Sequence, residues 1–305
     1  MIRLIRCVAL ALTLMPATGG AQDYDVGLAA AEAGDFATAL REWMPLAEQG
    51  NALAQGNLGV MYSNGQGVPQ DYAVAVKWYR MAADQGNALA QGDLGYMYDK
   101  GQGVQQDDVE AVKWYRMAAD QGNARAQSNL GYMYGTGQGV PQDDVEAIKW
   151  YRLSAEQGFA LSQENLGIMY NFGHGVPQDY AEAVKWYRLS AEQGYAQAQF
   201  SLGNMYDFGQ GVPQDYAEAI KWYRLAADQG DADAQYNLGQ MYSNGRGVPQ
   251  DFISAHMWFN IAAANGAERG PGSRADVAAK MSPADISEAQ RRANVCILSN
   301  YLDCG

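Results

Sequence analysis

Two kinds of segment with helical spacing alternate along most of the chain. One kind, seen at 71–85, has apolar residues at i, i+3, i+4, i+7 and i+8, namely Ala75, Trp78, Tyr79, Ala82 and Ala83. The other kind, seen at 52–64, shows helical spacing at Gln55, Leu58, Gly59 and Tyr62. Neither kind shows the strict apolar–polar alternation of a strand, so the sequence predicts an all-α fold.

The pair of segments returns with a fixed period of 36 residues. A glycine closes every unit, at Gly50, Gly86, Gly122, Gly158, Gly194, Gly230 and Gly266. Six full units run 51–86, 87–122, 123–158, 159–194, 195–230 and 231–266, together 51–266. Self-similarity at such a period is typical of a stacked array in which each unit packs on its neighbours. The sequence therefore predicts a solenoid of paired antiparallel helices.

Regular signals begin and end the helices. A segment of the form G-x-G-V-P-Q predicts a loop between the two helices, and the aspartate after it, such as Asp71, is the expected N-cap of the second helix. In four units a glutamate follows three residues later, at Glu110, Glu146, Glu182 and Glu218. This pattern predicts a capping box, with each glutamate also within reach of the lysine three residues on.

The N-terminal residues 1–21 have a different character from the repeats. Arg3 and Arg6 precede an apolar run, and small residues up to Ala21 supply a cleavage site. This pattern is typical of a secretory signal peptide, and the run is too short for a membrane span. We therefore expect a periplasmic or secreted protein with no membrane insertion after cleavage near Ala21.

Both ends of the array are expected to carry altered units. Residues 22–50 resemble a shortened N-terminal unit without the long glycine loop, and 267–305 are expected to form capping helices that begin at Ser282-Pro283. In the last repeat Met257, Asn260 and Ile261 replace the lysine, the arginine and the leucine or methionine of the other repeats. The loss of two charges indicates that this second helix is covered. Near the C-terminus, Cys296 and Cys304 are expected to form a disulfide in an oxidising compartment.

Composition excludes some functions. With 34 acidic and 21 basic residues the chain has a net charge of −13 and no basic run, so nucleic acid and anionic membranes are poor partners. His174 and His256 have no metal-type partners nearby in sequence, and we expect no metal site and no cofactor. The glycine loops lack the side-chain oxygens of a calcium loop and the third glycine of a phosphate loop.

The pattern L-G-x-M-Y…G-x-G-V-P-Q-D…A-x-K-W-Y-R-x-A-A-x-Q-G, which recurs in six units, resembles the Sel-one-like repeat family of the tetratricopeptide superfamily. The resemblance implies a right-handed superhelix whose first helices line the concave side, and an adaptor or scaffold that binds other proteins. Secreted bacterial members of the family, which this chain resembles, regulate envelope sensors or contact a host. Some cysteine-rich members are linked to penicillin binding and hydrolysis, but no repeat here contains a cysteine.

One face of each first helix varies between repeats. When each unit is numbered from its first residue, positions 3, 6, 10, 13 and 14 differ most and fall on one side of the helix. Apolar and aromatic side chains at these positions are the candidate partner-binding residues: Tyr96, Tyr132, Leu161, Ile168, Phe172, Phe200, Phe208 and Tyr236. They are accompanied by the carboxylates Glu164, Asp207 and Asp233. Such a surface suits an extended peptide or a partner helix, although the same side chains could also pad contacts between repeats.

Position 7 beside this face is short and polar in every unit. Its asparagines are Asn57, Asn129, Asn165 and Asn237, with Asp93 and Ser201 in the remaining units. An amide can hydrogen-bond the backbone of a bound peptide, because it offers both donors and an acceptor. It can equally bond a neighbouring helix, and the sequence does not decide between these two roles.

We therefore expect an exported, non-enzymatic repeat scaffold that holds a protein segment or peptide on its concave face. It could regulate an envelope sensor or a process of host contact. The alternative is a hydrolase directed at cell-wall material, similar to a penicillin-binding protein or β-lactamase, with Glu164 or Asp207 as base. A purely structural spacer is a third hypothesis, and the oligomeric state is not predicted.

Overall fold

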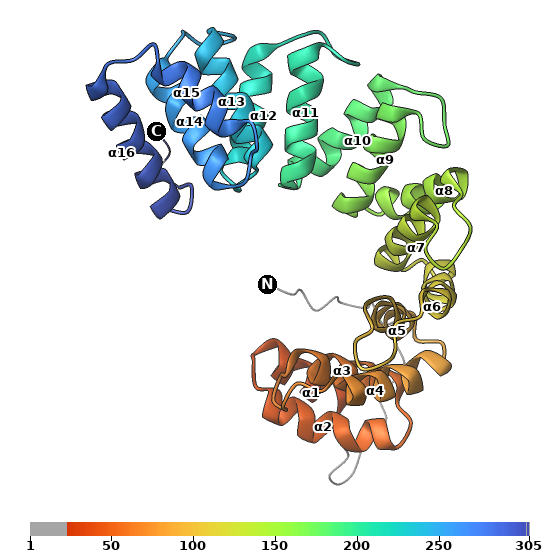
Figure 1. Ribbon diagram of the computed structural model, residues 1–305. Helices are drawn as coiled ribbons and strands as arrows, with labels where there is room; N and C mark the ends of the chain where they lie inside the picture. Colours follow the sequence, from red (N-terminus) through yellow and green to blue (C-terminus); the bar gives the residue numbers. More distant parts are fainter. Residues whose placement is uncertain (1–22, 303, 305) are drawn as a thin grey trace. The chain divides into compact units, whose positions relative to one another are not determined.

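The computed structural model describes residues 23–302 and Cys304, and every regular element among them is a helix (Figure 1). This confirms the all-α prediction. The expected signal peptide lies outside the described residues. The described residues divide into two compact units, one that ends at Gln142 and one that begins at Asp143. We call them the first and second unit, and we call each 36-residue period a repeat.

The first unit consists of seven helices among its described residues. They are α1 (Tyr24–Glu32), α2 (Phe36–Glu48), α3 (Ala52–Asn64), α4 (Tyr72–Asp84), α5 (Ala88–Lys100), α6 (Asp108–Asp120) and α7 (Ala124–Thr136). Helices α1 and α2, α3 and α4, and α5 and α6 pack as pairs, and each pair packs on the next. The first helices α3 and α5 of consecutive repeats also contact each other.

The second unit continues the same pattern. Its helices are α8 (Asp144–Glu156), α9 (Ala160–Phe172), α10 (Tyr180–Glu192), α11 (Ala196–Phe208), α12 (Tyr216–Ala227), α13 (Ala232–Asn244), α14 (Phe252–Ala264), α15 (Gly270–Ala278) and α16 (Pro283–Leu298). Helices α9 and α10, α11 and α12, and α13 and α14 pack as pairs, while α15 and α16 both pack on α14. Each unit is therefore a stack of paired helices, the arrangement that the repeats predict.

The predicted N-caps form, but the predicted capping box does not. Asp107 accepts a hydrogen bond from the backbone N–H of Glu110 at 2.9 Å, as an N-cap should. The carboxylate of Glu110 does not return to Asp107, because the N–H of Asp107 already donates to the carbonyl of Tyr98 at 3.0 Å. Glu110 instead accepts from Nε1 of Trp114 at 3.0 Å and pairs with Lys113 at 2.8 Å. The glutamate therefore fixes the tryptophan.

A buried glutamine joins consecutive repeats, a role that the helical spacing of these glutamines does not predict. Gln91 donates from Nε2 to the carbonyl of Ala83 in the preceding repeat at 3.1 Å. Its Oε1 accepts from Nε2 of Gln121 at 2.7 Å. The bond to the preceding second helix recurs for Gln55, Gln127, Gln163, Gln199 and Gln235. Since burying an amide without partners is unfavourable, this network fixes how one repeat sits on the next.

The C-terminal helices cover the end of the second unit. Met257 and Ile261 of α14 are buried, as their change from the repeat pattern predicts. Helix α16 begins at the predicted N-cap Ser282, whose side chain accepts from the N–H of Asp285. Cys296 and Cys304 form a disulfide in the same core cluster as Trp258. None of the described helices combines the length and apolar character that crossing a bilayer requires.

Candidate functional site

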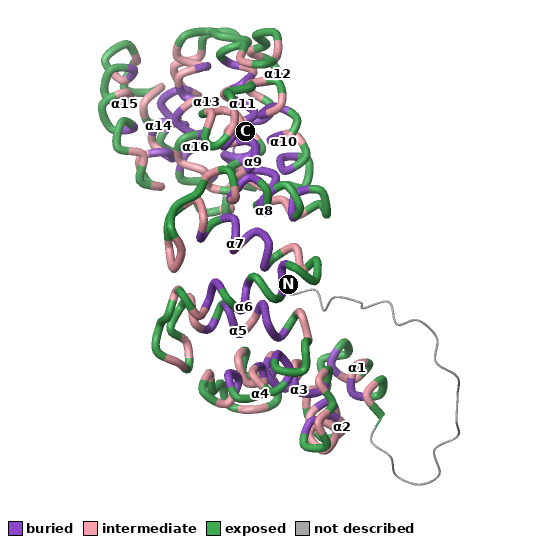
Figure 2. Tube along the Cα trace, turned by 90° about the vertical axis from the view of Figure 1, so that its right-hand side faces the viewer, coloured by how far each residue is buried: buried purple, intermediate pink, exposed green. Residues whose placement is uncertain are grey.

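In each compact unit the first helices expose variable side chains. Figure 2 colours the Cα trace by burial, and exposed and half-buried residues alternate with buried ones along these helices. In the first unit these side chains include Leu53, Leu89, Tyr96 and Tyr132, and we call them the first-unit stripe. In the second unit they include Leu161, Ile168, Phe172 and Phe208, the second-unit stripe. Phe172 and Phe208 are 62% and 64% exposed and occupy the same position of consecutive repeats. Large aromatic groups this open to water can be covered by a partner.

Two of the predicted residues are used within the protein. Phe200 is half-buried, with its ring 6.0 Å from that of Tyr223 between centroids. Tyr236 is only 9% exposed, because it packs 5.4 Å from the ring of Phe259 and lies beneath Arg269, which precedes α15. Neither belongs to either stripe, so a test of partner binding should use the exposed side chains.

The asparagines at position 7 contact neighbouring helices. Asn57 donates to the hydroxyl of Tyr24 at 3.0 Å, and Asn237 donates to Oδ1 of Asn204 at 3.2 Å. The hydroxyl of Tyr115 hydrogen-bonds the side chain of Asn129 in the next repeat. Asn165 is half-buried at the equivalent place. These contacts support the role between helices that the sequence left open, rather than a row of amides free for a peptide.

Asp93 takes the place of asparagine in the second repeat and forms an ion pair across repeats. Its carboxylate accepts from the guanidinium of Arg125 on α7. Burial raises the pKa of Asp93, and the charge of Arg125 opposes this effect. A charged residue at position 7 therefore also makes a contact between repeats, as the asparagines at this position do.

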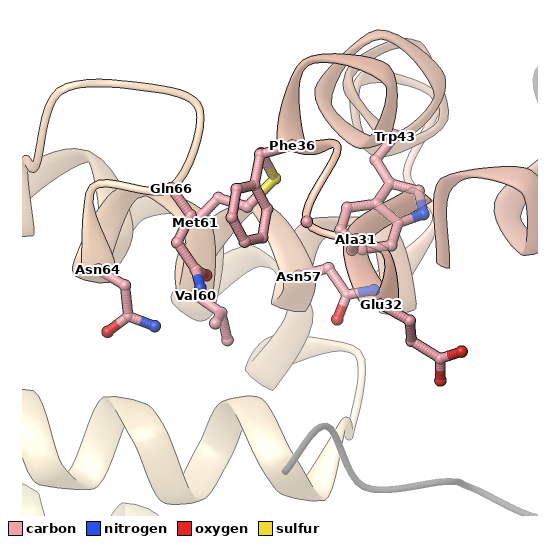
Figure 3. A pocket seen from close by; sticks show the side chains of 10 residues that line it. Ala31, Glu32, Phe36, Trp43, Asn57, Val60, Met61, Asn64 and Gln66 are labelled. Atoms are coloured by element: carbon pink, nitrogen blue, oxygen red, sulfur yellow. The ribbon is translucent and has the colours of Figure 1, made fainter. Parts of the chain in front are cut away.

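A pocket opens where the N-terminal helix pair meets the first full repeat (Figure 3). Its apolar wall includes Phe36, Trp43, Val60 and Met61, and its polar lining includes Asn57, Asn64, Gln66 and Glu32. The cavity is about 250 Å³. This is below the roughly 300–1,000 Å³ of common small-molecule sites, and it suits one or two side chains. The repeat pattern does not predict this pocket, because Phe36 follows its N-cap as Tyr72 and Phe252 do in full repeats.

Glu164 on α9 is a buried carboxyl without a neutralising charge. The residue is 4% exposed, and no described side chain makes a hydrogen bond or ion pair with it. Burial raises its pKa to about 7. The groups on which its charge acts are the phenols of Tyr187 and Tyr195, whose own pKa values are raised mainly by burial. The sequence pointed to this carboxylate but gave no sign that it is unpaired.

Asp207 on α11, the other carboxylate of the hydrolase hypothesis, lies in a different setting. It accepts from the hydroxyl of Tyr223 at 3.3 Å, and burial raises its pKa. Of the histidines, His256 is buried with a lowered pKa, caused by burial and then by Arg274. Exposed His174 lies 6.0 Å from the ring of Phe172. Within residues 23–302 and Cys304, no three His, Cys, Asp or Glu side chains gather as a metal site would require.

Comparison with known proteins gives a consistent result. The family model of the Sel1 repeat matches residues 52–87, 88–123, 124–159, 160–195, 196–231 and 232–266. No match is found among the curated proteins.

Two solved structures are similar at 35% sequence identity. A protective antigen present in uropathogenic Escherichia coli strains, which displays an SLR fold, has a TM-score of 0.79 over 92% of this chain and 64% of that chain. A Sel1 repeat protein from Oxalobacter formigenes has a TM-score of 0.72 over 80% of this chain and 97% of that chain. The chain thus spans less than two thirds of the length of the antigen.

Proposed function

Because the chain belongs to the Sel1 repeat family, we propose that it is a scaffold that binds a segment of another protein along the exposed side of its first helices. The binding involves no chemical step. The observation that carries the proposal is the exposure of large aromatic side chains on the first helices, with Phe172 and Phe208 as the most open. These side chains sit where the repeats differ, and a specific surface requires such variation.

The scaffold presents these side chains on rigid elements. Buried glutamines such as Gln91 and Gln163 tie each first helix to the preceding second helix. A partner therefore binds to a surface that is already ordered, and the entropy cost of association stays low. Burial of Phe172 and Phe208 against apolar side chains of the partner supplies the main favourable term.

We further propose that the protein acts in the periplasm or outside the cell. The N-terminal sequence is typical of a signal peptide, and the disulfide between Cys296 and Cys304 suits an oxidising compartment. The similar E. coli protein is a protective antigen, a property compatible with exposure to a host. In that setting the bound segment would belong to an envelope or host protein.

The double variant Phe172→Ser/Phe208→Ser tests the proposal. Both side chains are exposed, so we expect unchanged helix content and thermal stability by circular dichroism. Loss of two aromatic anchors should weaken partner binding by at least about 30-fold. Binding is measured by retention of proteins from an envelope extract on immobilised protein, followed by titration with the purified partner.

The matched control removes two exposed leucines from second helices of the same repeats. Leu189 on α10 and Leu225 on α12 are 45% and 41% exposed, so Leu189→Ser/Leu225→Ser removes exposed apolar side chains from another face of the same repeats. We expect this control to bind like the wild type. If the leucine variant lost the partner and the phenylalanine variant kept it, the assignment to the first helices would be wrong.

A further inference from the structure

Glu164 lies at a position of the first helix where no other repeat has a charged residue. The equivalent residues are Gly56, Gly92, Ser128, Phe200 and Tyr236. In the second repeat a side chain built on Gly92 would face Asn123 and Ala126 at the start of the next first helix. By the same register, Glu164 faces Tyr195 and Ala198, and the carboxylate does act on the pKa of the Tyr195 phenol. The carboxyl is thus a feature of one repeat and not of the shared architecture.

Polar groups gather around the Glu164 carboxyl, and none of those that act on it is a lysine or an arginine. Asn171 and Ser201 hydrogen-bond the hydroxyl of Tyr187, and the carboxylate of Glu164 acts on the same phenol. Oδ1 of Asn171 has no hydrogen-bond partner. The phenols of Tyr187 and Tyr195 stay neutral near pH 7 because burial raises their pKa values. When Glu164 is ionised, its negative charge is balanced by no cation among the described residues.

The oxygens of the Glu164 carboxyl keep some contact with solvent. The side-chain oxygens of the described residues that are sealed from solvent without a partner are those of Asn171 and Asp207. The oxygens of Glu164 are not among them, although the residue as a whole is only 4% exposed. The limited contact with water stabilises the ionised carboxylate of Glu164 poorly. Its charge is therefore unfavourable until a cation or a proton neutralises it.

Apolar residues of the second-unit stripe lie near Glu164 on the same helix. Leu161, Ile168 and Phe172 stand three residues before, four after and eight after Glu164, which places all of them near one face of α9. A ligand that fits must therefore offer apolar groups and, between them, a group that donates hydrogen bonds and carries positive charge. Lysine and arginine side chains donate hydrogen bonds without accepting any, and they carry a positive charge on an apolar stem.

We propose that Glu164 is the anchor for a lysine or arginine side chain of the bound protein segment, with large apolar residues of that segment on the second-unit stripe. This inference rests on the proposed function and specifies the chemistry of the partner. The net charge of −13 favours the approach of a basic segment, and Glu164 selects where its charged group is held. Glu164 acts here as a specificity residue.

The test is selection from a displayed library of short random peptides on the full chain, repeated on Glu164→Gln. The glutamine variant keeps the shape of the side chain and removes an unfavourable buried charge, so it is expected to fold. We expect peptides selected by the wild type to contain lysine or arginine next to large apolar residues. Peptides selected by Glu164→Gln should keep the apolar residues and lose the basic one.

A synthetic peptide of the selected sequence then gives the magnitude. Replacing its arginine by citrulline, or its lysine by acetyl-lysine, should weaken binding to the wild type by about 10-fold or more, and binding to Glu164→Gln by less than about 3-fold. Peptides that need Phe172 and Phe208 but do not distinguish Glu164→Gln would overturn the anchor and leave the proposed function standing. A library from which the wild type retains no peptide would overturn both.

Discussion

Replacing Gly103 by alanine is expected to destabilise the first unit by about 3 kcal/mol. Gly103 lies in the loop between α5 and α6 with φ of +71°, a conformation that costs an L-residue about 1–2 kcal/mol. A Cβ atom there would also lie 2.3 Å from the carbonyl carbon and oxygen of Tyr72, at the start of α4. Backbone atoms cannot turn away as a side chain can, so overpacking adds about 1–3 kcal/mol. The loop would be forced off the preceding repeat.

Gly122→Ala is the matched control for this prediction. Gly122 has φ of +87°, but nothing lies within 4 Å of the position that a Cβ atom would take. This variant should therefore lose only the conformational term, about 1 kcal/mol. Urea unfolding followed by circular dichroism compares the midpoints of the two variants. Equal midpoints would show that the contact between Gly103 and Tyr72 does not hold the repeats together.

Glu164→Gln is expected to stabilise the second unit above neutral pH by about 2–3 kcal/mol. Burial raises the pKa of Glu164 from 4.5 to about 7 in the folded protein, so the native state holds its proton more tightly than the unfolded chain. As the pH rises between these two values, Glu164 ionises in the unfolded chain and keeps its proton in the folded protein. Stability contributed by this residue therefore falls as pH rises from about 4.5 to about 7. Because the carboxyl of Glu164 keeps partial contact with solvent, the stabilisation is smaller than the free energy that corresponds to the whole pKa shift.

The measurement is the difference in unfolding free energy between wild type and Glu164→Gln across this range. Taking the difference removes other buried carboxyls such as Asp207 and Asp231, whose pKa values are also raised by burial. We expect no difference near pH 4 and the full difference near pH 8. Parallel curves at all pH values would mean that Glu164 is solvated in the folded protein.

The repeat period determined most of the fold from sequence. Glycine, proline and aspartate at fixed offsets predict where helices begin and end, because these residues act through local backbone geometry. The capping box failed for a reason that local sequence does not contain. The N–H of Asp107 is taken by the carbonyl of Tyr98 in the preceding helix, and the indole of Trp114 then takes the carboxylate of Glu110.

The candidate site was predictable as a face but not residue by residue. Helical periodicity separates the variable side of the first helix from the constant one, and Phe172 and Phe208 are exposed on it. Tyr236 occupies a variable position too, yet Arg269 covers it, and a contact between distant segments of this kind leaves no periodic signal. Whether Glu164 has a partner likewise depends on the side chains that neighbouring repeats place around it.

Site-specific photo-crosslinking in cells that produce the protein tests whether a partner binds the exposed side of the first helices. A photoreactive amino acid replaces Phe172 or Phe208 on the first helices, and in parallel Leu189 or Leu225 on the second helices. All four positions are exposed, so none of the substitutions should disturb the fold. We expect a discrete crosslinked protein from Phe172 and Phe208 and none from the two leucine positions. Adducts only from the leucine positions would contradict binding on the first helices.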